Sequence, residues 1–178
     1  MPFAGSSLSD GRCLADDRLL LSAPMGDPMM ETTITTHCAE ETMDLGRRIG
    51  SRLKGGEVFA ICGPLGSGKT HLIKGIASGA GAIDRENVTS PTFVIVNQYR
   101  GRFDIFHLDA YRIESLAEFE MLGFDDFCYP QSVVLIEWAD KIEPAIRDMA
   151  PIWIDLAHAG PKTRIIRIRN MSEHLQIL

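Results

Sequence analysis

The sequence predicts an α/β protein built on one mixed, mostly parallel β-sheet. Apolar runs rich in β-branched and aromatic residues, typical of buried strands, alternate with segments whose apolar residues recur at helical spacing. Two strand-like runs, residues 91–99 and 102–111, are joined around the turn Arg100-Gly101-Arg102, which predicts a β-hairpin. A hairpin among otherwise alternating strands and helices makes the sheet mixed instead of purely parallel.

Length and composition favour a single globular domain without a large nucleic-acid-binding surface. The chain has 178 residues, of which 45% are hydrophobic and 24% are charged, as in an ordinary soluble protein. The formal net charge of −6 argues against binding nucleic acid through bulk electrostatics. The four cysteines form no C-x-x-C pair and the five histidines no H-E-x-x-H motif, so neither disulfides nor a zinc site is expected.

The first 30 residues differ from the rest of the chain. Residues 1–30 are rich in Gly, Ser, Pro and Asp and are predicted to form a flexible extension ahead of a domain spanning residues 31–178. No apolar run approaches the length of a membrane span, and the N-terminus lacks the basic and apolar regions of a signal peptide. We therefore expect a cytoplasmic protein that does not bind a membrane.

The first half of the domain is predicted to contain two strands, each followed by a helix. Residues 32–38 alternate like a half-buried strand, and residues 39–53 carry apolar side chains at helical spacing. Residues 58–62, VFAIC, have the composition of a short buried strand. A second helix is predicted after residue 70 and ends at the Gly-rich segment 78–82.

The second half follows the predicted hairpin. Residues 114–122 have a helical pattern, and Gly123 is the expected stop. Residues 132–138 form a buried strand that carries an acid at its carboxyl end. Residues 151–158 and 163–169 are the last two predicted strands.

The segment GPLGSGKT, between the second strand and the second helix, matches the phosphate-binding pattern G-x-x-x-x-G-K-[ST]. A strand, a Gly-rich turn and a helix together direct backbone N–H groups toward phosphate, whereas the alternative is a Gly-rich turn with a surface lysine. Lys69 would place a positive charge at the β and γ phosphates, and the Thr70 hydroxyl would bind Mg²⁺. The predicted nucleotide-binding residues here are Gly63, Pro64, Leu65, Gly66, Ser67, Gly68, Lys69, Thr70 and His71. The loop specifies the predicted fold as a three-layer P-loop NTPase.

Two acids are candidates for the Mg²⁺ or water-orienting role that a phosphate loop requires. Glu137 ends the run VVLIE, and Asp109 follows DIFHL in the same way. Acids at the carboxyl ends of strands lie beside the ligand crevice of an open α/β sheet. The alternative for each is a carboxylate that caps a turn or pairs with an arginine. The pattern does not divide the catalytic roles between them.

Three further residues are weaker candidates. Thr92 lies in SPTF, where a threonine could reach the γ phosphate as in a switch loop, although Ser-Pro-Thr is also a common turn. Arg112 could neutralise phosphate or pair with a nearby acid. Trp138 is either a packing residue or an anchor for a partner. The absence of an N-K-x-D motif disfavours a Ras-like GTPase, and the shortage of arginines between the loop helix and the hairpin weakens a nucleotide kinase.

Taken together, these motifs resemble the TsaE (YjeE) family of bacterial P-loop ATPases. The resemblance rests on T-x-x-x-G at 42–46, GPLGSGKT, SPTF at 90–93, HLDAYR at 107–112 and IEW at 136–138. Their order and spacing run through residues 31–169. The family resemblance implies a compact α/β domain that binds ATP and Mg²⁺ and hydrolyses ATP weakly alone. It also implies action with the TsaD and TsaB proteins, which transfer threonylcarbamoyl to adenosine-37 of tRNA.

The resemblance also implies roles for individual residues. Lys69 and Thr70 would hold phosphate and Mg²⁺, and Glu137 would be the Mg²⁺-linked acid. Asp109 would be the acid of the HLD motif, and Thr92 would lie in the switch-like loop. Lys69, Asp109 and Glu137 are therefore the predicted catalytic residues, and Thr70 and Glu137 the predicted metal ligands.

Other positions carry over less directly. Trp138 matches the family tryptophan, and Arg164 and the segment 38–42 are expected to border the nucleotide. Pro64 stands where the family commonly has an acid, and His71 where a small or polar residue is usual. Neither departure removes a required group.

The function we predict is Mg²⁺-dependent ATP hydrolysis in support of tRNA N6-threonylcarbamoyladenosine synthesis. The partners would be TsaD and TsaB, and tRNA would be contacted indirectly through their complex, in keeping with the acidic net charge. Two alternatives remain open. One is a small-molecule or nucleotide kinase, and the other is a non-hydrolytic nucleotide sensor that binds partners according to its occupancy.

Overall fold

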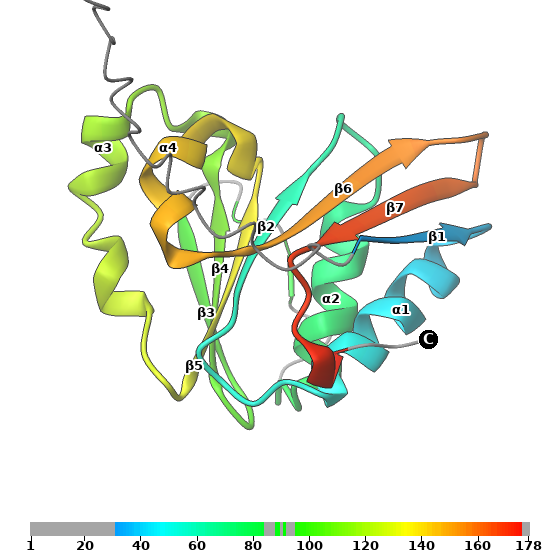
Figure 1. The fold of residues 1–178 in the computed structure, drawn as a ribbon, viewed down its shortest axis with the longest axis horizontal. Coiled ribbons are helices and arrows are strands. Elements are labelled where there is room, and N and C mark those ends of the chain that lie inside the picture. Colours follow the sequence, from blue (N-terminus) through cyan, green and yellow to red (C-terminus); the bar gives the residue numbers. More distant parts are fainter. Residues whose placement is uncertain (1–30, 84–87, 90, 92–94, 176–178) are drawn as a thin grey trace, which may run out of the picture.

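A seven-stranded sheet forms the centre of the molecule (Figure 1). The computed structural model describes residues 31–83, 88–89, 91 and 95–175. In this part of the chain the strand order is β1-β7-β6-β2-β5-β4-β3. The predicted extension, residues 1–30, lies outside the described residues.

The sheet is mixed, as predicted. β2 pairs in parallel with β5 and β6, and β4 pairs in parallel with β5, whereas β1–β7, β6–β7 and β3–β4 are antiparallel. The β3–β4 pair is the predicted hairpin. The strands are β1 (Thr32–Thr36), β2 (Val58–Cys62), β3 (Val96–Arg100), β4 (Asp104–Asp109), β5 (Ser132–Glu137), β6 (Ile152–His158) and β7 (Arg164–Arg169). The parallel ladder brings the carboxyl ends of β2, β4 and β5 to the same edge.

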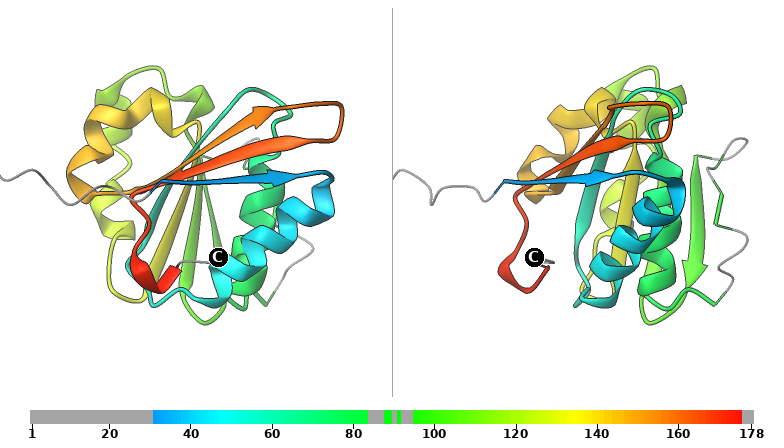
Figure 2. Two further views of the ribbon diagram at one scale, coloured as in Figure 1. Left: turned by 45° about the vertical axis from the view of Figure 1, so that its right-hand side comes forward. Right: turned by 90° about the vertical axis from the view of Figure 1, so that its right-hand side faces the viewer.

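Helices cover both faces of this sheet, which gives the three predicted layers (Figures 1 and 2). α1 and α2 lie on one face, and α3 and α4 lie on the other with several short 3₁₀ turns. The helices are α1 (Ala39–Ser51), α2 (Lys69–Gly79), α3 (Leu116–Glu120) and α4 (Glu143–Ile146). The sequence pattern predicted the first three helices and did not predict α4. The predicted range of α3, residues 114–122, is two residues longer at each end than the observed helix. Within the described residues no helix is both long and apolar enough to cross a membrane.

Two apolar cores lie on the two sides of the sheet. One packs Leu45 of α1 and Ile76 of α2 against strand residues that include Phe59. The other packs Phe119 of α3 against the opposite face, which includes Ala60. Because successive side chains of a strand point to opposite faces, neighbouring residues of β2 contribute to different cores. All five residues of β2 are buried, so the strand before the phosphate loop is fixed from both sides.

α1 and α2 approach each other through glycines. A Cβ added to Gly46 would lie 2.4 Å from the carbonyl oxygen of Leu72, and one added to Gly75 would lie 2.2 Å from that of Met43. Gly50 and Gly79, one turn further along each helix, would meet carbonyl oxygens at 2.1 and 2.2 Å. These backbones therefore pack at distances that no larger side chain permits. The contact holds the start of α1 beside the start of α2.

Candidate functional site

The phosphate loop connects β2 to α2 and depends on left-handed backbone at three glycines. The φ angles of Gly63, Gly66 and Gly68 are 139°, 74° and 101°, a region that glycine enters without steric cost. Gly63 is also crowded, because a Cβ there would lie 2.4 Å from the carbonyl oxygen of Leu156. The loop therefore runs close against β6 before it turns into α2.

Lys69, at the first position of α2, is folded back onto this loop. Its Nζ donates to the carbonyl oxygens of Gly63 at 2.7 Å and Pro64 at 3.1 Å. It also lies 3.6 Å from the ring centroid of Trp138. The side chain is only 4% exposed, and burial lowers the pKa of the amine, whereas the negative charge of Glu137 acts in the opposite direction. The charge is thus held inside the loop by carbonyl oxygens and an aromatic face.

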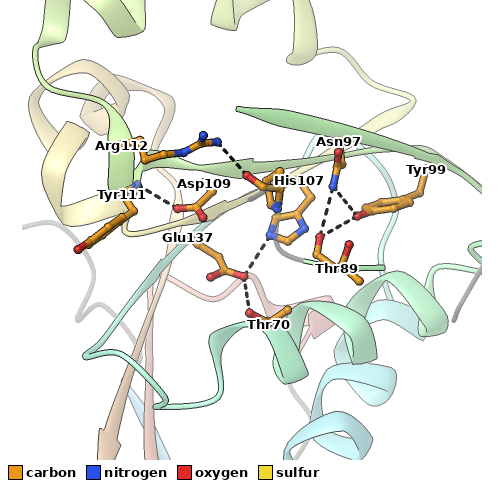
Figure 3. A network of polar contacts seen from close by, with 10 residues as sticks. Thr70, Thr89, Asn97, Tyr99, His107, Asp109, Tyr111, Arg112 and Glu137 are labelled. Atoms are coloured by element: carbon orange, nitrogen blue, oxygen red, sulfur yellow. Dashed lines mark hydrogen bonds and ion pairs between the residues drawn. The ribbon is translucent and has the colours of Figure 1, made fainter. Parts of the chain in front are cut away.

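Thr70 and Glu137 meet across 67 positions of sequence. The Thr70 hydroxyl donates to Oε1 of Glu137 at 2.9 Å. Glu137 is the last residue of β5 and is 3% exposed. The same oxygen, Oε1, lies 3.2 Å from Nε2 of His107 on β4 (Figure 3). The predicted metal ligands are therefore in direct contact, with a histidine behind the carboxylate.

Asp109 lies beside Glu137 at the end of the neighbouring strand. The two residues are partners in the parallel β4–β5 register, so both carboxylates leave the sheet at the same edge. Oδ1 of Asp109 accepts a hydrogen bond from the backbone N–H of Tyr111 at 3.0 Å (Figure 3). Asp109 therefore caps the 3₁₀ turn Ala110–Arg112, which was the structural alternative for this acid, and also belongs to the site.

These groups line one cavity of about 420 Å³. Its volume lies within the range of ordinary ligand sites. It is bounded by the loop, the start of α2 and the ends of β4 and β5. The lining residues are Leu65, Gly66, Ser67, Gly68, Lys69, Thr70, His71, Asp109, Tyr111, Glu137 and Trp138. The structure thus brings together the three predicted catalytic residues and most of the predicted loop, whereas Gly63 and Pro64 face Lys69 through their carbonyl groups.

A second cavity, of about 290 Å³, lies on the other side of the loop. It is lined by residues 38–40 and Thr42 at the start of α1, by His71, and by residues 161–162 with Arg164. Gly66, Gly68 and His71 border both cavities, so the two are neighbours. The segment 38–42 and Arg164, which the family resemblance led us to expect beside a nucleotide, contribute to this cavity.

Arg164 braces the phosphate loop from β7. Its Nε donates to the carbonyl oxygen of Ser67 and one terminal nitrogen to that of Gly66, both at 3.1 Å. The other terminal nitrogen donates to the carbonyl oxygens of Gly160 and Thr163. The guanidinium group thus fixes the loop backbone from outside.

Of the two remaining predicted residues, the structure describes only Arg112. Thr92 lies outside the described residues. Arg112 donates to the carbonyl oxygen of Pro91 at 3.0 Å, which ties the turn after β4 to the segment before β3 (Figure 3).

Thr70 and Glu137 have the chemistry of a Mg²⁺ site. Both are hard oxygen donors, and Mg²⁺ is usually bound by one or two protein oxygens together with phosphates and waters. Their 2.9 Å contact places the two donors where one small cation could face both. The residues present therefore fit the cation that the phosphate-loop motif implies.

Two residues of the site, one lining the cavity and one behind it, were not predicted from the sequence. Tyr111 borders the cavity and packs against Trp138 with ring centroids 5.0 Å apart. His107 contacts Glu137 and is fully buried. A signal for His107 existed in the H-x-D pattern, because residues two apart on a strand share a face, and His107 shares one with Asp109.

The chain resembles known proteins over most of the described residues. A family model described as "Threonylcarbamoyl adenosine biosynthesis protein TsaE" matches residues 36–166. A Bacillus subtilis protein named "tRNA threonylcarbamoyladenosine biosynthesis protein TsaE" is 35% identical over 140 residues, covering 78% of this chain and 85% of that protein. A Treponema pallidum protein of the same name is 38% identical over 104 residues, covering 58% and 76%. The crystal structure of Bacillus subtilis YdiB matches with a TM-score of 0.61 and 28% identity, covering 80% of this chain and 87% of that one.

Proposed function

The chain belongs to the TsaE family, and from this premise we propose that it is a Mg²⁺-dependent ATP hydrolase required for N6-threonylcarbamoyladenosine modification of tRNA. The observation that carries the proposal is the convergence of Lys69, Thr70, Asp109 and Glu137 on one cavity beside the phosphate loop. A cation, a hydroxyl and two carboxylates at a helix N-terminus are the groups that phosphoryl transfer to water requires.

ATP would lie across both cavities. Its phosphates would contact the loop and the start of α2, where backbone N–H groups and Lys69 face the larger cavity. Its nucleoside would extend past Gly66, Gly68 and His71 into the smaller cavity at the start of α1. The shared border residues support this path, because they allow one ligand to occupy both spaces.

Lys69 would supply the principal charge stabilisation. To contact phosphate, its Nζ would exchange the carbonyl oxygens of Gly63 and Pro64 for phosphate oxygens. In a buried site a fixed positive charge interacts with the developing negative charge more strongly than it would in water. The residue is therefore assigned to stabilising the transition state.

The two acids would have different roles. Glu137, already joined to Thr70, would hold Mg²⁺ with that hydroxyl. The bound cation would neutralise charge on the β and γ phosphates. Asp109 borders the same cavity from the end of β4, and we assign it to orienting the attacking water. This division was left open by the sequence pattern.

The biological setting follows from the family. The chain would act with TsaD and TsaB in the cytoplasm, where its ATPase would support repeated turnover of the transferase. A net charge of −6 suits a protein that contacts other proteins and reaches tRNA through them.

The decisive experiment measures ATP hydrolysis by the pure chain, with and without TsaD and TsaB, alongside tRNA modification. We expect weak Mg²⁺-dependent hydrolysis that the partners stimulate, and modification that depends on the chain. Absence of both would overturn the proposal. Transfer of the γ phosphate to an acceptor other than water would identify a kinase instead. A Glu137→Gln variant that binds ATP, does not hydrolyse it and still supports modification would identify a sensor.

A further inference from the structure

His107 is a fully buried polar side chain on a central strand of the sheet. It lies on β4, is 0% exposed, and shares its face of the strand with Ile105, which is also fully buried. Its neighbours across the sheet are Leu135 of β5, which is likewise 0% exposed, and Asn97 of β3. Packing alone would favour an aliphatic residue here, because an imidazole without a partner costs free energy on burial.

The hydrogen bond that explains a buried histidine at this position is made with Glu137, in the proposed catalytic site. Nε2 lies 3.2 Å from Oε1 of Glu137, whereas Nδ1 has no hydrogen-bond partner among the described residues. A carboxylate oxygen only accepts, so Nε2 carries the proton and donates. In the neutral ring, Nδ1 is then the nitrogen without a proton.

The same contact restricts the orientation of Glu137. Oε1 accepts from both Thr70 and His107, from the α2 side and from β4 (Figure 3). The other carboxylate oxygen, Oε2, is turned away from both donors in Figure 3. A glutamate has several rotatable bonds, and two donors on one oxygen hold it in a single arrangement at the cavity wall. Thr70 would be occupied by Mg²⁺ during turnover, so His107 would then be the protein donor that keeps Glu137 in place.

We propose that His107 is a positioning residue that fixes Glu137 for Mg²⁺ binding through its Nε2–H donor. The inference rests on the proposed function, since it assigns Glu137 to the cation. His107 lines neither cavity, so it would itself touch neither nucleotide nor cation. Groups of this kind behind a metal ligand commonly change metal affinity or activity by 10- to 100-fold when they are removed.

The test compares two substitutions of equal length. His107→Gln keeps an N–H donor near the position of Nε2, and His107→Met has a similar shape without any donor. Tyr99→Phe is the matched control, because the Tyr99 hydroxyl bonds to Thr89 and Asn97 beside His107 and does not contact Glu137. Each variant is titrated with ADP by calorimetry at a series of Mg²⁺ concentrations, and its ATP hydrolysis is measured over the same series.

We expect His107→Met to raise the Mg²⁺ concentration needed for half-maximal ADP binding and hydrolysis by about tenfold. His107→Gln should lie close to wild type, as should Tyr99→Phe. The inference is wrong if His107→Met behaves like wild type, or if Gln and Met are equally impaired, since the second result indicates packing. Wild-type protein that shows Mg²⁺-dependent ADP binding without hydrolysis would overturn the proposed ATPase, and the ADP titrations would still decide the role of His107.

A measurement on the unmodified protein covers the case in which His107→Met does not fold. The ¹⁵N chemical shifts of the imidazole report which ring nitrogen is protonated, and the His107→Gln spectrum assigns the signal. We expect Nε2 to be protonated. A neutral ring protonated at Nδ1 could not donate to Glu137 and would refute the inference.

Discussion

Glycines occur in two regions of this molecule for different physical reasons. In the phosphate loop, Gly66 and Gly68 have φ angles of 74° and 101°, and a Cβ at either would meet no atom closer than 3.8 Å. Between α1 and α2, Gly46 and Gly50 have ordinary helical backbone, and a Cβ would lie within 2.4 Å of a carbonyl oxygen. Gly66 and Gly68 are therefore needed for the backbone conformation of the loop, whereas the glycines of the helix pair are needed for close approach.

We expect this difference to separate the variants that change activity from the variants that change stability. Changes in the loop alter where N–H groups and Lys69 point, whereas changes between the helices alter the distance between two elements of the core. We therefore expect loop variants to lose activity while remaining folded. Variants of the α1–α2 contact should lose stability while the folded fraction keeps its chemistry.

The largest expected effect is the loss of ATP hydrolysis when the positive charge of Lys69 is removed from the phosphate loop. Lys69→Met keeps the length of the side chain and removes the amine that would face the phosphates. Removing one such electrostatic contact typically lowers kcat by about 10²–10³-fold, or about 3–4 kcal/mol. Because burial lowers the pKa of this amine, an apolar replacement should leave the melting temperature unchanged or higher.

The measurement is steady-state hydrolysis beside thermal unfolding of the same preparation. Lys74→Met, on the same helix but outside both cavities, is the control and should retain activity. A Lys69→Met protein that is unfolded, or as active as wild type, would contradict the separation of chemistry from stability.

The next effect is at the helix pair. In Gly50→Ala the new methyl group would lie 2.1 Å from the carbonyl oxygen of Ile76, so the helices must move apart. Alanine favours a helix by about 1 kcal/mol over glycine, but overpacking of this kind costs typically 1–3 kcal/mol or more. The close contact is with backbone and cannot be relieved by a rotamer change. We expect a net loss of about 2 kcal/mol, or roughly 4–8 °C in melting temperature for a chain of this size.

Arg48→Ala, at an exposed position of the same helix, controls for the substitution itself. It should change the melting temperature little. If Gly50→Ala has wild-type stability, α1 and α2 do not require the close approach. If it abolishes hydrolysis well below its melting temperature, the two regions are coupled.

The same two regions differ in how far their structure can be predicted from the sequence. The phosphate loop was predicted residue by residue, because its conformation is encoded locally in glycine spacing. The strand-end acids were also predicted, because Asp109 and Glu137 directly follow apolar runs. The α1–α2 contact was not predicted, since Gly46 and Gly75 acquire their meaning only when two separate helices meet. A glycine inside a helical pattern otherwise indicates only lower helix propensity.

The side-chain contacts within the site could not be predicted from the sequence either. The bond from Thr70 to Glu137 joins residues 67 positions apart, and that from His107 to Glu137 depends on the β4–β5 register. Neither distance nor register can be read from one sequence without pairing the strands. Motif spacing therefore identifies the residues of the site, and the sheet topology determines their partners.

A smaller effect is expected for the loop glycines. Gly68→Ala introduces a side chain with free space around it, the nearest atom being 3.8 Å away on Leu156. The cost is then backbone strain alone, about 1–2 kcal/mol for an L-residue in left-handed conformation. Because Gly68 is the N-cap of α2, the loop can relieve the strain by turning its N–H groups away from the phosphates. We expect ADP affinity, measured by calorimetry, to fall about tenfold, the equivalent of 1.4 kcal/mol, with a small change in melting temperature. A variant destabilised as much as Gly50→Ala but with normal affinity would reverse the assignment of the two regions.

The smallest effect concerns a left-handed residue that is not glycine. Trp138 has a φ angle of 58°, and its ring lies under the amine of Lys69 and against Tyr111. Its backbone N–H donates to the carbonyl oxygen of Ile61 at 3.0 Å, which helps hold this conformation. The ring would therefore stabilise Lys69 in its inward position.

Trp138→Phe weakens this contact and keeps an aromatic surface. A cation–π contact is worth about 0.5–1 kcal/mol at partly exposed sites and is strongest for tryptophan. In the proposed phosphate-bound state Lys69 would leave the ring, so a weaker contact should tighten ADP binding by about two- to fourfold. Calorimetry at fixed Mg²⁺ measures the change, and Trp153→Phe on β6, outside both cavities, is the control. Weaker binding by Trp138→Phe would mean that the ring contacts the nucleotide itself. In that case the left-handed backbone at Trp138 serves the ligand directly, as the loop glycines do.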